Sequence, residues 1–339
     1  MIRSGTLFWW VALARRATRA SMAIACVLAP PLMLATTAHA QSWPARPVRL
    51  IVPITAGTLT DITARLIADR LRVTLGQQIV VDNRAGAGGI VGMNALVRSA
   101  PDGYTMGFVP ASVLTLTPVL FRNPQFDADR DLVPVVAVVT TPFMVAVHPG
   151  SGIESFPDLV KRARAQPDKI NIAVLARNTA VHLAGELLAS ASGIRLYVVP
   201  YKGATDAVAS VVSGENAVTI GGVATMATLA RAGKLRAIAT TSRERLPGHE
   251  NIPTVAETVP GFEVGGWFGI VAPMGTPAEA IERINRDVNA IIRVPEVAAR
   301  LVEFGAFPSG GSPAALGEFI RAERPVWAKL ARDLGIQPE

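Results

Sequence analysis

The chain has 339 residues, of which 50% are hydrophobic, and its formal net charge is +7 at pH 7. Four of its 33 basic residues lie in the first forty positions, so the remainder has 29 basic and 26 acidic residues. Its lysines and arginines are scattered, without clusters interleaved with aromatic residues, which excludes a nucleic-acid partner. A chain of this length can form two domains.

The first forty residues are typical of a secretory signal peptide. They combine arginines, no acid, an apolar run at 22–34 and a small-residue site that ends at Ala40. The rival interpretation is a membrane anchor, but two prolines interrupt the run, which is shorter than the roughly 20 residues that a span needs. The sequence therefore predicts export to the periplasm, with cleavage after Ala40.

The single cysteine, Cys26, lies in the segment that would be removed. A lipoprotein anchor at Cys26 is the alternative, but apolar sequence continues beyond it. The exported chain would then have no disulfide, no thiol nucleophile and no cysteine metal ligand.

Strand and helix patterns alternate beyond residue 40. An apolar run at 48–54 ends at a glycine turn, and apolar residues spaced by three and four then predict a helix from Ile62 to Leu75, which Gly76 stops. The next predicted elements are a strand at 78–81, a helix at 90–98 and, after a Pro-Asp-Gly turn, a strand at 104–109.

A second cycle of elements follows the apolar run Leu132–Val147, which is long enough to cross between two domains. The expected elements are a helix capped by Ser155 and running to Ala165, helices at 180–190 and 204–212, and strands at 170–174, 196–200, 217–220 and 236–240. The run Gly266–Ala272 is interpreted as the return crossing, and helices at 277–292, at 295–304 and from Ser312 onward end the chain. This alternation favours parallel sheets covered by helices, with ligands beyond the carboxyl ends of the strands.

Several motifs resemble those of one family. They are the stretch 42–105, the HLAGE sequence at 182–186 and the PYKG turn at 200–203. With them the chain resembles, nearly end to end, the periplasmic solute receptors of tripartite tricarboxylate transporters, the Bug or TctC-like family. The resemblance implies an α/β, two-lobed periplasmic-binding-protein-like (type II) fold, in which each lobe is a mainly parallel sheet flanked by helices and the ligand cleft lies between lobes. It assigns 1–40 to the signal peptide, 41–143 plus 262–339 to lobe 1, and 144–261 to lobe 2.

This resemblance implies a monomeric receptor, without cofactor or catalytic residues, that captures a small organic carboxylate and delivers it to a membrane permease. One alternative is a ligand sensor of the same fold that acts on a signalling partner. Another is a hydrolase or isomerase that uses His182, but the sequence has no G-x-S-x-G elbow and no cysteine beyond Cys26.

The first candidate binding loop follows the strand at 48–54. Its amides and the positive end of the following helix would attract a carboxylate, so the residues Ala56, Gly57, Thr58 and Asp61 are expected at the ligand. The alternative is that Thr60 or Asp61 only caps the helix. The family's loop reads PAGGxxD, and this chain departs from it with ITAGTLTD.

The glycine-rich stretch Asn83–Gly89 is interpreted as scaffold. It resembles a dinucleotide loop, but the G-x-G-x-x-G pattern fails because Val91 stands where the third glycine is needed. In the loop after the third strand, Ser112 alone keeps the hydroxyl of a family stretch that is richer in serine and threonine, and it is expected at the ligand.

The remaining candidate residues come from the second cycle of elements, and the resemblance places them across the cleft. They are Asn178, Thr179, His182, Tyr201, Gly203, Gly221 and Thr225. The family usually has an acidic and an amide residue at the positions of Gly221 and Gly222. Without that carboxylate the chain lacks a partner for a ligand ammonium, which favours plain carboxylates over amino acids.

His182 and Glu186 are four residues apart on one predicted helix, a spacing that can ligate metal. The other histidines beyond residue 40, His148 and His249, have no ligand spacing. We therefore expect no metal, and a His182 held by a local hydrogen bond.

Overall fold

The computed structural model describes residues 43–177 and 179–338, which belong to one compact unit. The predicted signal peptide, Cys26 and the candidate Asn178 lie outside the described residues. The strands are β1 (Val48–Val52), β2 (Ile79–Asn83), β3 (Thr105–Pro110), β4 (Leu132–Val147), β5 (Asn171–Leu175), β6 (Tyr197–Tyr201), β7 (Val218–Gly222), β8 (Arg236–Thr240), β9 (Gly265–Pro273) and β10 (Phe307–Pro308). The helices are α2 (Leu59–Leu75), α3 (Ile90–Val97), α4 (Thr117–Leu120), α5 (Ala128–Asp131), α6 (Phe156–Ala165), α7 (Ala180–Ala191), α8 (Ala204–Val212), α9 (Val223–Arg231), α10 (Ala278–Ile291), α11 (Pro295–Glu303) and α12 (Pro313–Asp333).

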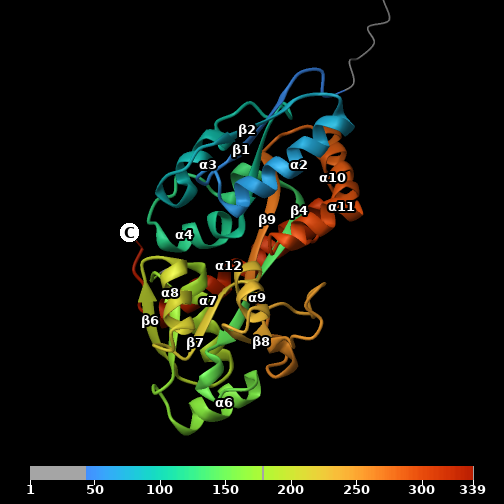
Figure 1. Ribbon diagram of the computed structural model, residues 1–339. Coiled ribbons are helices and arrows are strands. Elements are labelled where there is room, and N and C mark those ends of the chain that lie inside the picture. The colour runs from blue at the N-terminus through green and yellow to red at the C-terminus, as the bar shows by residue number, and fades with distance from the viewer. Residues whose placement is uncertain (1–42, 178, 339) are drawn as a thin grey trace, which may run out of the picture. The chain divides into compact units, whose positions relative to one another are not determined.

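The long strand β4 joins two groups of strands (Figure 1). Its first part, Leu132–Pro142, pairs with β9, and its last part, Phe143–Val147, pairs with β7. The strand order is β2-β1-β3-β9-β4-β7-β5-β6, and β8 and β10 also pair with β4. The apolar run predicted to cross between two domains is this strand, with the predicted bounds.

Strand β9 differs from its expected role. It pairs with β3 and with the Leu132–Pro142 part of β4, so all of its ladder lies on one side of the junction. The chain therefore crosses back to the first group of strands before Gly265. Just before that residue, the Val264 amide donates to the Thr241 carbonyl over 3.1 Å. The expectation that Gly266–Ala272 is itself the crossing is wrong, because the apolar character of this run reflects burial in the sheet.

The sheet is mixed. β1 runs parallel to β2 and β3, and β5 runs parallel to β6 and β7, as the alternating strand and helix patterns predict. β4 and β9 run antiparallel to their neighbours. The parallel pairs bring the carboxyl ends of β1 and β3 to one edge, and those of β5, β6 and β7 to another, and these edges carry the candidate loops.

Each group of strands has its own buried core. Helices α2 and α10 cover β1, β3 and β4, where Ile67, Phe108 and Val288 are buried. Helix α12 packs against β4 and contributes to two clusters, through Ile320 at one and Trp327 at the other (Figure 1). Helix α12 therefore spans the junction at which β4 changes partners.

Candidate functional site

A cavity of about 230 Å³ lies between the loops that follow β3 and β5. The β3 side contributes Pro110, Ala111, Ser112, Thr115 and Leu116, and the β5 side contributes Leu175, Thr179, Ala180 and Val181. Thr141 and Phe143 of β4, Gly265–Phe268 of β9, and Glu323 and Trp327 of α12 complete the lining. We call this space the β3/β5 cavity. Its position at the carboxyl ends of two strands is where open α/β sheets bind ligands.

The glycine turn after β2 supports the β3 side of the cavity. The chain forms a π-helical turn at Ser112–Leu116, and the Thr117 hydroxyl donates to the Gly88 carbonyl over 2.8 Å. Gly89 has a φ of +95°, and a Cβ there would lie 2.6 Å from the Val113 side chain. Only glycine accepts both this backbone conformation and this close approach. The turn acts as scaffold for the loop that carries Ser112.

The β3/β5 cavity presents hydrogen-bond donors from two sides. Ser112 lines it, and in the described part of the chain no hydrogen bond engages the Ser112 hydroxyl. On the opposite side α7 begins at Ala180, so the amides of Ala180 and Val181 have no acceptor within the helix. The first turn of α7 contains no acidic side chain. The positive end of this helix therefore favours a carboxylate in the cavity.

Thr179 serves this site through the backbone. Its Oγ1 accepts from the His182 amide at 3.2 Å and donates to the Ala176 carbonyl at 2.8 Å. The hydroxyl is therefore committed to the N-cap of α7, and a contact between Thr179 and the ligand remains a prediction. Thr179 lines the cavity and fixes the start of the helix.

A partly buried carboxyl group also lines the β3/β5 cavity. Glu323 of α12 accepts hydrogen bonds from the indole N–H groups of Trp267 (2.8 Å) and Trp327 (2.9 Å), one on each oxygen. Burial raises the pKa of the Glu323 carboxyl, and the two indole donors oppose this rise only in part. This acid, which was not among the predicted site residues, connects β9 to α12 beside the cavity. A Glu and a Trp four residues apart on the last predicted helix were the available signal.

The first candidate loop is closed by one of its own side chains. Thr58 is the N-cap of α2, and the Asp61 carboxylate accepts from the Gly57 amide at 2.8 Å and from Arg65. Asp61 is 3% exposed. The expectation of an unpaired Gly57 amide is wrong, because the side chain at the third helical position reaches back to that amide. Asp61 has the capping role that was left open, while ligand binding at Ala56, Gly57, Thr58 and Asp61 remains a prediction.

The ionisation of Asp61 should be visible in the stability of the protein. Burial acts to raise the pKa of Asp61, but the hydrogen bonds from Arg65, the Gly57 amide and Asn83 hold it below the ordinary value of 3.8. Asp61→Asn should lower the free energy of unfolding by about 1 kcal/mol at pH 7, since the amide keeps one acceptor and loses the charge. Because the folded pKa lies below the unfolded value of 3.8, this contribution is fully present above that value, shrinks as the pH falls below it, and is lost only below the folded pKa. Denaturant unfolding of both proteins at a series of pH values from 7 downward measures it, and a difference that does not shrink below pH 3.8 would contradict this role.

Three further candidates lie away from the β3/β5 cavity. His182 is 3% exposed, and its Nε2 lies 3.5 Å from Glu186 Oε1. The Tyr201 hydroxyl donates to Glu215 at 3.0 Å and accepts from Asn216 at 2.8 Å. Gly203 is the N-cap of α8. None of the three lines this cavity or the groove described below, and their ligand roles remain predictions.

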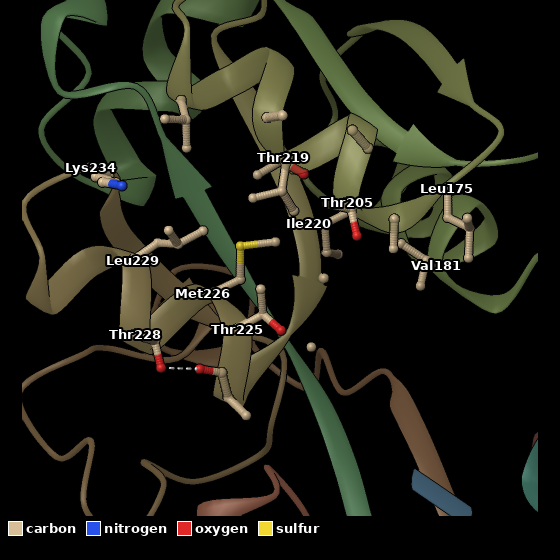
Figure 2. Close-up of a pocket in the computed structure, with 18 residues that line it drawn as sticks. Leu175, Val181, Thr205, Thr219, Ile220, Thr225, Met226, Thr228, Leu229 and Lys234 are labelled. Atoms are coloured by element: carbon tan, nitrogen blue, oxygen red, sulfur yellow. Dashed lines mark hydrogen bonds between the residues drawn. The ribbon is translucent and has the colours of Figure 1, made fainter. Parts of the chain in front are cut away.

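Gly221 and Thr225 line a second space, a groove of about 750 Å³ between α8 and α9 (Figure 2). We call it the α8/α9 groove. Its floor is β7 at Thr219 and Ile220, and its walls include Val208 and Met226. Helix α9 was not among the predicted elements, although Val223, Met226 and Ala227 have the three-and-four spacing of a buried helical face.

The candidates thus fall into four places. Ser112 and Thr179 share the β3/β5 cavity, and Gly221 and Thr225 share the α8/α9 groove. Asp61 and its loop lie beyond β1, and His182, Tyr201 and Gly203 surround the second group of strands without entering either space.

Two groups of βαβ units joined by β4, with a cavity at their strand ends, are the architecture of periplasmic solute-binding proteins, and solved structures of that class match this chain along most of its length. The predicted α/β periplasmic-binding-protein class is therefore confirmed. The chain belongs to the tripartite tricarboxylate transporter family of receptors, TctC, whose model matches residues 63–336. Members of this family are periplasmic solute-binding receptors and not enzymes. Among the described residues, every helix is too short or too polar to span a bilayer.

Several relatives are similar over nearly their whole length. The protein BugT of Bordetella pertussis is 34% identical over 304 residues, which cover 89% of this chain and 93% of BugT. The R. palustris protein Rpa4515, solved with adipate, is 34% identical with a TM-score of 0.71, covering 88% of this chain and 100% of that one. MatC from Rhodopseudomonas palustris with bound malate is 27% identical with a TM-score of 0.66, covering 85% and 99%.

Proposed function

We propose that this protein captures a small organic carboxylate in the β3/β5 cavity and delivers it to the membrane permease of a tripartite tricarboxylate transporter. The observation that carries the proposal is the pairing of Ser112 with the N-terminus of α7 across one cavity. A carboxylate there would accept from the Ser112 hydroxyl and from the amides of Ala180 and Val181. Family membership and the relatives solved with adipate and malate support an organic acid as ligand.

The ligand would act by holding the two groups of strands together. A molecule that contacts both Ser112 and α7 favours the arrangement in which the two loops are close, which is the hinge mechanism of a two-lobed receptor. In this proposal the lobes are 41–143 plus 262–339 and 144–261. The receptor works as a monomer in the periplasm, which it reaches through the signal peptide predicted at 1–40.

The charges around the cavity favour an acid without an amino group. Among the lining residues that the structure describes, Glu323 is the one acidic side chain, and both Glu323 oxygens already accept indole hydrogen bonds. Burial raises the pKa of Glu323, which disfavours the charged form that would pair with an ammonium. We therefore expect plain carboxylates to bind more tightly than amino acids of the same size.

A thermal-shift screen tests this function. Purified protein is heated with a library of small carboxylates and with the matching neutral amides as controls. An acid at a hundred times its Kd should raise the free energy of unfolding by about 2.7 kcal/mol, and its amide should have no effect. Stabilisation by amides and acids alike, or by neither across the library, would overturn the proposal.

A further inference from the structure

The α8/α9 groove is larger than the β3/β5 cavity and is lined mainly by apolar side chains. Its volume is about 750 Å³ against about 230 Å³. The apolar lining residues are Leu175, Val181, Val208, Val212, Ile220, Met226 and Leu229. A groove with such a lining, beside a small polar cavity, has room for the apolar part of a ligand.

The groove has few polar side chains, and two of its four threonine hydroxyls are engaged in hydrogen bonds. The Thr219 hydroxyl donates to the Ala173 carbonyl over 3.0 Å, and the Thr228 hydroxyl donates to the Ala224 carbonyl over 2.8 Å. Lys234 is the single charged side chain among the described lining residues, and it lies at the end of the groove opposite Leu175 (Figure 2). The groove can therefore bury the apolar surface of an organic ligand, and it offers that ligand few hydrogen-bonding partners.

The groove and the β3/β5 cavity are neighbours. Leu175, the last residue of β5, and Val181, in the first turn of α7, line both spaces. Figure 2 shows these two side chains together at one end of the groove. The amides of Ala180 and Val181, which would bind a carboxylate, therefore lie next to the Val181 side chain, which lines the groove.

Two glycines also line the groove. Gly222 is the N-cap of α9, and a Cβ added there would have no atom within 4 Å. A Cβ on Gly221 would meet the end of the Met226 side chain at 2.6 Å.

We propose that the α8/α9 groove binds the apolar body of the ligand, so that this receptor selects carboxylates with an extended aliphatic chain. The carboxylate lies in the β3/β5 cavity, and the chain passes Leu175 and Val181 into the groove. This inference rests on the function proposed above. Helices α8 and α9 have nine residues each and are about 13 Å long, which leaves room for a chain of several methylene groups.

Calorimetry with straight-chain monocarboxylates from acetate to decanoate tests the inference. Each methylene group that enters the groove should lower Kd by about fourfold, because its surface leaves water. Ala209→Leu places a larger side chain in the groove from an exposed position on α8, where leucine is a good helix former. In this variant the gain with chain length should disappear, while the Kd of the shortest acids stays within twofold of the parent.

The matched control is Ala290→Leu, the same change at an exposed position of α10 that lines neither space. It should keep the dependence on chain length. Short acids that bind while longer ones bind no better would overturn the groove proposal and leave the carboxylate receptor standing. An Ala209→Leu variant that binds decanoate as tightly as the parent would also overturn it. A protein that binds no acid of any length would overturn both proposals.

Discussion

Replacing Ala180 by aspartate should weaken carboxylate binding roughly a hundredfold while leaving the fold intact. Ala180 is the first residue of α7 and lines the β3/β5 cavity. A second carboxylate about 5 Å from the ligand costs about 3 kcal/mol at an effective dielectric constant of 20. The same charge at a helix N-terminus stabilises the helix by about 0.3 to 1 kcal/mol, so lost binding cannot be attributed to unfolding.

Ala180→Asn is the control for this variant. Asparagine has nearly the same shape as aspartate but no charge, so its Kd should rise only a few fold. Calorimetry with an acid found in the screen measures both variants. An aspartate variant that binds as tightly as the asparagine variant would show that the ligand carboxylate does not lie at α7.

Replacing Glu323 by alanine should lower the free energy of unfolding by about 2 to 5 kcal/mol. The change leaves the indole N–H groups of Trp267 and Trp327 without their acceptor, and each buried donor without a partner costs about 1 to 3 kcal/mol. Glu318→Ala, at an exposed position of the same helix, should change the stability by less than about 0.5 kcal/mol. Equal effects of the two substitutions in denaturant unfolding would refute this structural role.

The pH dependence separates the charge of Glu323 from its hydrogen bonds. Because burial raises the pKa of the folded Glu323 above 4.5, the stability that this group contributes is fully present below about pH 4.5 and is lost as the pH rises through the folded pKa. Glu323→Gln cannot ionise. The free energy of unfolding of the parent minus that of the variant should therefore decrease between pH 4 and pH 7, and a constant difference would contradict the raised pKa.

Much of the fold follows from local patterns. The run at 132–147 is continuous, apolar and rich in valine, and it forms β4 with the predicted bounds. Helix α2 begins at Leu59, three residues before the predicted start at Ile62, because Thr58 caps it. The prediction that Gly266–Ala272 is the return crossing was wrong. An apolar run indicates that a strand is buried, but it does not indicate which strands pair with it.

The site was harder to predict because it depends on which groups the side chains contact in the folded protein. The pattern of residues 55–61 indicates a helix start, and it does not reveal that Asp61 occupies the Gly57 amide. The π-helical turn at Ser112 is held by contacts with Gly88 and Gly89, far along the chain. Glu323 becomes part of the cavity only through Trp267 on β9. Local sequence therefore placed candidates in several loops, of which those after β3 and β5 line the cavity, and tertiary contacts decided which atoms face it.

A crystal structure of the protein with the tightest-binding acid from the screen is the most direct test. We expect the carboxylate between Ser112 and the first turn of α7, within hydrogen-bonding distance of the Ser112 hydroxyl and of the amides of Ala180 and Val181. A complex in which these groups contact no ligand atom, with the acid bound elsewhere on the protein, would contradict the account.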